Sequence, residues 1–237
     1  MSYAERSYAS DLFAIDAAAD VRAAFIRRTY AHLAVAILAF VGLECLFLNV
    51  EAIREPLFRL FARAWWAVLI GFMVVGWVAD KWAQSDTSVG MQYLGLALYT
   101  LAESIIFVPL LYIAGKFGGP GVIPTAGIVT ITLFVGMTII VLMSGADFSF
   151  LRTGLWVAGL AATGLIICSL IFGFSLGIFF SAGMAILACG YVLYYTSAVL
   201  HHYRTDQHVA AALALFAAVA LLFWYIVRII MELQRRD

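Results

Sequence analysis

Seven long apolar stretches alternate with short polar segments along this chain. The stretches carry almost no charge, and most approach the roughly 20 residues that a helix needs to cross the hydrocarbon core of a bilayer. The expected spans are residues 30–50, 64–79, 91–114, 124–143, 154–172, 178–200 and 209–231. The pattern therefore predicts an all-α integral membrane protein with seven transmembrane helices.

The polar segments divide the chain into two parts. Residues 1–29 are expected to form a polar N-terminal tail, and 20–28 are a candidate interfacial helix. The tail lacks the apolar core of a cleavable signal peptide. A single seven-helix membrane domain is expected over 30–237, with a charged loop over 51–63 and no room for a separate soluble domain.

Composition agrees with a bilayer as the partner of this chain. Hydrophobic residues make up 65% and charged residues 12%, whereas a soluble domain carries about twice that charged fraction. The formal net charge is zero, which argues against a nucleic-acid partner. The three cysteines lie in apolar stretches, without the spacing of a disulfide framework or a metal site.

Alanine is concentrated in the first half of the seventh stretch. Small residues let helix backbones approach closely in lipid, so we infer that this helix lies inside the bundle. The alternative is that alanine is simply abundant in the whole chain. The alanines are Ala210, Ala211, Ala212, Ala214, Ala217, Ala218 and Ala220.

The basic cluster before the first span favours a cytoplasmic N-terminus, although basic residues are almost balanced between the two sides of the membrane.

Two acidic residues lie inside apolar stretches. Glu103 is near the middle of the third span, and Glu44 lies two-thirds of the way along the first. An acid at the centre of a membrane helix costs about 2.5–3.5 kcal/mol. The functional interpretation is a cation or proton pathway, and the structural one is a protonated carboxyl bonded to a neighbouring helix. Pro109 removes the backbone bond to the Ile105 carbonyl, which predicts a bend beside Glu103.

No set of residues with catalytic spacing stands out. Four residues of the loop before the last span invite a metal hydrolase interpretation, but adjacent histidines on a helix are a poor ligand pair, so we expect a solvated loop. No nucleophile elbow, phosphate loop or dinucleotide fingerprint is present. We therefore expect no enzyme activity, no cofactor and no bound metal. The four loop residues are His201, His202, Asp206 and His208.

Four stretches in order resemble the Bax inhibitor (TMBIM) family. They are YTLAESIIFVPLL at 99–111, DFSFL at 147–151, GYVLYYTS at 190–197 and TDQHVAAALALF at 205–216. The resemblance implies seven spans, with the last helix enclosed by the other six. It also implies links to pH-sensitive calcium leak, to suppression of cell death in animals, and to modulation of a membrane-anchored AAA protease in some bacteria.

The resemblance implies a pH sensor made of two aspartates, and this chain has neither. Tyr195 stands at the position that ends the sixth span, and Ala218 stands at the position in the seventh. Two facing carboxylates can share a proton and bind a hard cation, whereas a phenol and a methyl group cannot.

These patterns support one leading function and one alternative. The leading hypothesis is a non-enzymatic bacterial inner-membrane protein with a regulatory or interaction role, with a membrane-anchored AAA protease as a candidate partner. The alternative is a calcium or proton leak that uses Glu103 and Glu44, with Pro109 beside them.

Overall fold

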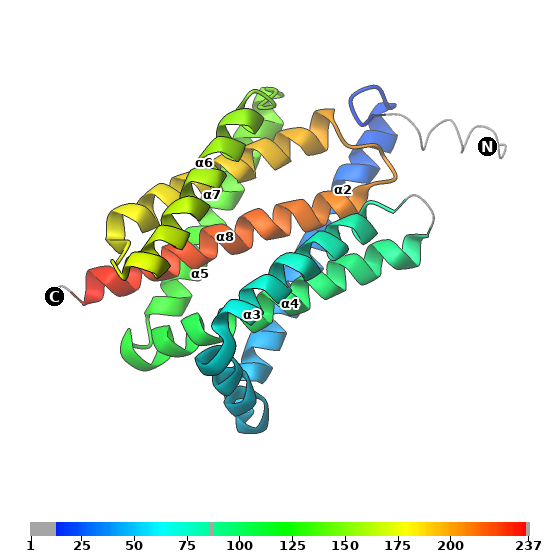
Figure 1. Ribbon diagram of the computed structural model, residues 1–237. Helices are drawn as coiled ribbons and strands as arrows, with labels where there is room; N and C mark the ends of the chain where they lie inside the picture. Colours follow the sequence, from blue (N-terminus) through cyan, green and yellow to red (C-terminus); the bar gives the residue numbers. More distant parts are fainter. Residues whose placement is uncertain (1–12, 86–87, 236–237) are drawn as a thin grey trace. The chain divides into compact units, whose positions relative to one another are not determined.

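The computed structural model describes residues 13–85 and 88–235, and its regular secondary structure in those ranges is helical (Figure 1). Each of the seven helices there is long and apolar enough to cross a membrane. The predicted all-α multi-pass membrane fold is therefore confirmed. The helices are α2 (Ala19–Asn49), α3 (Glu51–Ala83), α4 (Val89–Phe117), α5 (Val122–Ser144), α6 (Leu151–Phe172), α7 (Gly177–His201) and α8 (His208–Gln234).

The ends of the helices differ from the sequence prediction at the start of the chain. Residues 20–28 do not form a separate interfacial helix, because α2 begins at Ala19 and continues into the first span. Residues 1–12 of the expected tail lie outside the described residues. Later boundaries agree better: Gly145 and Gly173 end α5 and α6 in the left-handed conformation that glycine favours.

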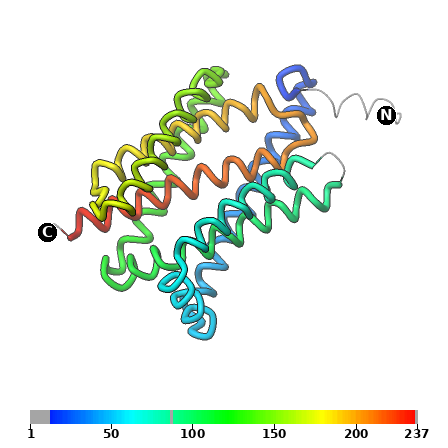
Figure 2. Tube along the Cα trace, viewed as in Figure 1, coloured from blue at the N-terminus to red at the C-terminus, as the bar shows by residue number. Residues whose placement is uncertain are grey.

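The charged segment 51–63 is helical, so the loop predicted there is wrong. It forms the first part of α3, which we call the α3 arm (residues 51–63). Ala64 has non-helical dihedral angles (φ −144°, ψ 43°) and separates the arm from the apolar part of α3. Figure 2 shows the change of direction in this helix. The helix persists because the residues of the arm that are partly shielded from solvent recur at helical spacing: Ile53, Arg54, Leu57, Phe58 and Phe61.

The chain divides into two compact units, which we describe separately. The first unit contains the chain up to Ile113 together with His202–Phe216. Within it α2 packs against α3, and the end of α3 lies directly against α4. Gly95 makes the second contact possible, because a Cβ there would lie 2.5 Å from the Ala79 carbonyl oxygen and 2.7 Å from the Ala83 nitrogen.

The second unit contains Ala114–His201 and the chain from Ala217 onward. Within it α7 packs against both α5 and α6. The Tyr191 hydroxyl of α7 donates a hydrogen bond to the Leu155 carbonyl of α6 at 3.1 Å. This bond joins two helices that are close because Gly190 leaves room for the Leu155 side chain.

Helix α8 is the most buried of the seven. In its most apolar window 78% of the residues are buried, against 0–44% in the other helices. All seven alanines that the sequence places in the last span belong to α8, and five of them are buried: Ala210, Ala211, Ala212, Ala218 and Ala220. The prediction of an interior last helix, made from its small residues, is confirmed.

Candidate functional site

Glu44 belongs to the buried face of α2. That face repeats every three or four residues, as an amphipathic helix requires, and the residues around Glu44 are otherwise apolar. The Glu44 side chain is 5% exposed, and neither of its carboxyl oxygens has a hydrogen-bond partner among the described residues. A buried polar group without a partner is uncommon and calls for an explanation.

Glu103 is buried in α4 but has a partner. Its side chain is 7% exposed, and the Tyr99 hydroxyl, one turn earlier on the same face, donates a hydrogen bond to Oε1 at 3.1 Å. Two further buried hydroxyls of this helix are satisfied locally. Thr100 Oγ1 donates to the Leu96 carbonyl and Ser104 Oγ donates to the Thr100 carbonyl, both at 2.9 Å. Glu103 therefore lies on a polar stretch of an otherwise apolar helix.

An aromatic cluster packs together the helices that carry the two acids. Phe40, one turn before Glu44, meets Phe107, one turn after Glu103, with ring centroids 5.0 Å apart and edge to face. Phe216 of α8 contacts both Phe40 and Tyr99. The structure thus places both acids in one unit, on helices that touch, but no hydrogen bond joins the two carboxyl groups.

Pro109 lies two residues after Phe107 in the same helix. Helix α4 continues through it from Val89 to Phe117. The proline still leaves the Ile105 carbonyl, two residues after Glu103, without its helical donor.

The two positions of the implied pH sensor both lie in the second unit. Ala218 is buried in α8. Tyr195 is half-buried in α7, where its ring stacks on Tyr191 and touches Tyr194. The Tyr195 ring is thus part of a row of tyrosines.

The four loop residues do not gather as metal ligands. Among the described residues, no three side chains of the His, Cys, Asp and Glu types are placed to hold a metal ion. Asp206 instead forms an ion pair with Arg204 through two nitrogens, at 3.0 and 3.2 Å. The loop also receives the start of the described chain, because the Ala14 amide donates to the Tyr203 carbonyl.

His208 meets a residue that the sequence analysis did not single out. Its ring contacts His32 of α2 edge to face, with centroids 4.9 Å apart. His32 Nε2 lies 2.9 Å from the Tyr93 hydroxyl of α4, so three helices meet at these polar side chains. Nothing in the sequence spacing connects residues 32, 93 and 208.

A second contact that the sequence analysis missed joins two of the family-like stretches. Ser197 of α7 accepts a hydrogen bond from the Phe148 amide at 2.8 Å, and its hydroxyl lies 3.3 Å from both the Ala146 carbonyl and the Asp147 carboxylate. Asp147 also accepts from the Ser149 amide at 2.9 Å. A buried serine therefore helps to fix the DFSFL segment to the end of α7.

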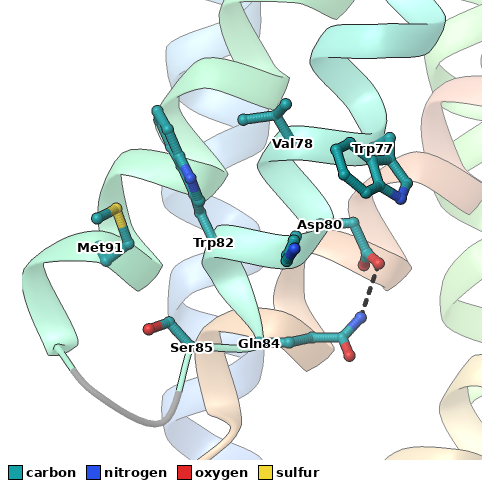
Figure 3. Close-up of a pocket in the computed structure, with 8 residues that line it drawn as sticks. Trp77, Val78, Asp80, Trp82, Gln84, Ser85 and Met91 are labelled. Carbon is teal, nitrogen blue, oxygen red and sulfur yellow. Dashed lines mark hydrogen bonds between the residues drawn. The ribbon is translucent and has the colours of Figure 1, made fainter.

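A depression of about 750 Å³ lies at the turn between α3 and α4 (Figure 3). Trp77, Trp82 and Met91 border it, Lys81 lies over the Trp77 ring, and Asp80 accepts a hydrogen bond from Gln84 at 2.7 Å. None of the predicted site residues lines this depression. The buried acids, rather than this surface feature, are the candidate functional site.

Fold and burial together define a class of protein: a multi-pass α-helical membrane protein with carboxyl groups inside its helical bundle. The family model described as "Inhibitor of apoptosis-promoting Bax1" matches residues 22–236. The chain therefore belongs to the Bax inhibitor family, as its motifs predicted.

Relatives from distant organisms cover nearly the whole chain. Protein lifeguard 4 of Mus musculus is 26% identical, and the match covers 93% of this chain and 90% of the mouse protein. Bax inhibitor 1 of Schizosaccharomyces pombe is 27% identical, and the match covers 94% of this chain and 81% of the yeast protein. An uncharacterized protein of Pseudomonas aeruginosa is 28% identical, covering 84% of each chain. The likeness thus extends over the helical domain and includes a bacterial protein.

Proposed function

We propose that this protein is a non-enzymatic leak pathway for protons or cations, in which Glu44 and Glu103 carry the ion. The observation that supports the proposal best is the burial of Glu44 with both carboxyl oxygens unpartnered. Glu103 supports it further, because a second acid is buried on a helix that packs against α2. This geometry favours the leak over the regulatory role, which was the leading hypothesis from the sequence alone.

The energetic argument rests on the bilayer. A charged carboxylate at this depth costs about 2.5–3.5 kcal/mol, and no described residue donates a hydrogen bond to Glu44 to offset that cost. The group is stable only when it holds a proton or meets a cation. Such residues inside membrane helices commonly mark ion pathways or proton relays.

The side chains available to bind an ion favour a proton as the first ion to test. Calcium takes six to eight oxygen ligands at once. Among the described residues no cluster of three acidic, histidine or cysteine side chains is available, whereas a single carboxyl is enough to carry a proton.

The test is flux through the purified full-length protein in liposomes, followed with internal pH and calcium dyes. We expect Glu44→Gln to lower the proton flux at least tenfold, because glutamine keeps the shape but cannot exchange a proton. Glu103→Gln should lower it as well. Glu51→Gln is the matched control, since Glu51 is exposed at the start of α3. If both buried variants conduct like the wild type, the acids are structural and the proposal fails.

A regulatory role is the second candidate, and the names of relatives favour it. The relatives include Bax inhibitor 1 and, at 24% identity, a "Golgi anti-apoptotic protein" of vaccinia virus. For this chain we propose the bacterial inner membrane as the site of action, a cytoplasmic N-terminus, and a membrane-anchored AAA protease as the candidate partner.

The two roles can be separated in cells. The half-life of a membrane substrate of the protease is measured with the wild-type protein, with the Glu44→Gln variant, and with neither. A regulator changes the half-life and keeps that effect when Glu44 is replaced. An effect that disappears with Glu44 assigns the regulation to the leak, and no effect at all contradicts the regulatory role.

A further inference from the structure

The α3 arm presents one face to the protein and another to its surroundings. On the inner face, the Arg54 guanidinium donates a hydrogen bond to the Leu48 carbonyl of α2 at 3.0 Å and lies 5.4 Å from the centre of the Tyr112 ring of α4. Phe58, one turn later, meets the same ring with centroids 4.8 Å apart. These contacts fix the arm and its orientation within the first unit.

The outer face carries two cations side by side. Arg59 and Arg63 are four residues apart, so they project from the same side of the helix. Both are exposed, and neither has a hydrogen bond or an ion pair among the described residues. Leu60 beside them is 47% exposed, and Glu55, one turn before Arg59, is the last acid of the arm. The last part of this face, from Arg59 to Arg63, therefore combines positive charge with apolar surface, whereas Glu51 and Glu55 lie on its first part.

Two tryptophans follow the arm immediately. Trp65 and Trp66 come directly after the bend at Ala64 and are 43% and 58% exposed. Tryptophan is enriched at the headgroup level of membranes, where one side of the ring system is apolar and the other is wet. A depth at the lipid headgroups is therefore expected for the bend and for the two arginines before it.

Arginine suits this depth because its planar guanidinium binds phosphate oxygens through two parallel hydrogen bonds. We propose that the α3 arm is an interfacial anchor that binds the headgroups of anionic phospholipids, with Arg59 and Arg63 as the phosphate-binding residues. The arm is expected to prefer lipids with a net negative charge over zwitterionic lipids, because neither arginine forms an ion pair with any of the described residues. The anchor needs neither Glu44 nor Glu103, so it is independent of the proposed leak.

The test uses the purified full-length protein with phosphatidylglycerol and phosphatidylcholine as competing lipids. Native mass spectrometry measures the ratio of the two lipids bound. Each basic side chain near an anionic surface contributes about fivefold. We therefore expect Arg59→Gln with Arg63→Gln to lower the preference for phosphatidylglycerol by about tenfold or more. The double lysine variant keeps the charge and should retain most of the preference.

Hydrogen exchange in nanodiscs locates the effect. Amides of the α3 arm should exchange more slowly in discs that contain phosphatidylglycerol than in discs of phosphatidylcholine alone, and the double glutamine variant should lose that difference. The control removes two exposed arginines elsewhere, by Arg27→Gln with Arg152→Gln. Equal protection in the two lipids, or an equal loss of preference in the control, would overturn the proposal.

Discussion

At the scale of single residues, Gly95 shows how little space the contact between α3 and α4 leaves. A Cβ atom added at Gly95 would lie within 2.7 Å of backbone atoms of Ala79 and Ala83, and these atoms cannot rotate away as a flexible side chain could. We expect Gly95→Ala to lower the free energy of unfolding by about 1–3 kcal/mol, since overpacking outweighs the better helix propensity of alanine.

Thermal unfolding in detergent checks this effect. Gly136→Ala is the control, because Gly136 is in the middle of α5 and a Cβ there would meet nothing within 4 Å. That variant should unfold at the wild-type temperature or slightly above it. A Gly95→Ala protein as stable as the Gly136→Ala protein would show that α3 and α4 can separate freely.

The sequence predicts part of the candidate site and not the rest. The burial of Glu44 and Glu103 follows from their apolar neighbours in the chain. The bond from Tyr99 to Glu103 could also have been read from the sequence, because residues four apart share a helix face. The unpartnered state of Glu44 could not, since it depends on which side chains the neighbouring helices bring to it.

At the scale of elements, hydrophobic length is a reliable guide to the existence of a membrane helix and a poor guide to its ends. The α3 arm has too many charges to span a bilayer, and such a high content of charged residues is typical of a loop. Its shielded residues nevertheless follow helical spacing from Ile53 to Phe61, which was a readable signal. The ring of Tyr112 that the arm packs on is some fifty residues away and could not be inferred.

The link between α7 and the loop after α5 gives a prediction for elements. Ser197→Ala removes the acceptor of the Phe148 amide and the hydroxyl beside Asp147. Leaving such a group unpaired costs about 1–3 kcal/mol, so the loop should open more often. We expect amides 145–150 to exchange faster with deuterium, while the rest of the second unit is protected as before.

The control for this substitution is Ser181→Ala in the same helix. Ser181 is also buried, but its hydroxyl bonds to the Gly177 carbonyl of its own helix, so no loop depends on it. Unchanged exchange over 145–150 in the Ser197→Ala protein would mean that the other contacts of Asp147 hold the loop without the serine.

At the scale of the whole molecule, the seven-helix fold of the Bax inhibitor family is present without the two aspartates that the resemblance associates with pH-sensitive calcium leak. By that resemblance, Tyr195 of α7 and Ala218 of α8 stand at the positions of the two aspartates. A fold built mainly by apolar length and small residues does not depend on these carboxylates, so the architecture forms without them. The chemistry that two carboxylates perform together is then expected to be missing.

We therefore expect the wild-type protein to show no pH-gated calcium flux, and Tyr195→Asp combined with Ala218→Asp to gain it. Two nearby carboxylates can share one proton and release it to bind calcium through oxygen, whereas one carboxylate supplies half of the charge and has no partner for the proton. Each single variant should thus stay silent in a calcium-dye assay on liposomes at neutral and acidic pH. The two added acids cost about 2.5–3.5 kcal/mol each unless they protonate or bind a cation, so the double variant should be less stable in a calcium chelator than in calcium. Calcium flux with such a pH dependence in the wild-type protein, or in either single variant, would show that a carboxylate pair at these positions is not what gates calcium in this fold.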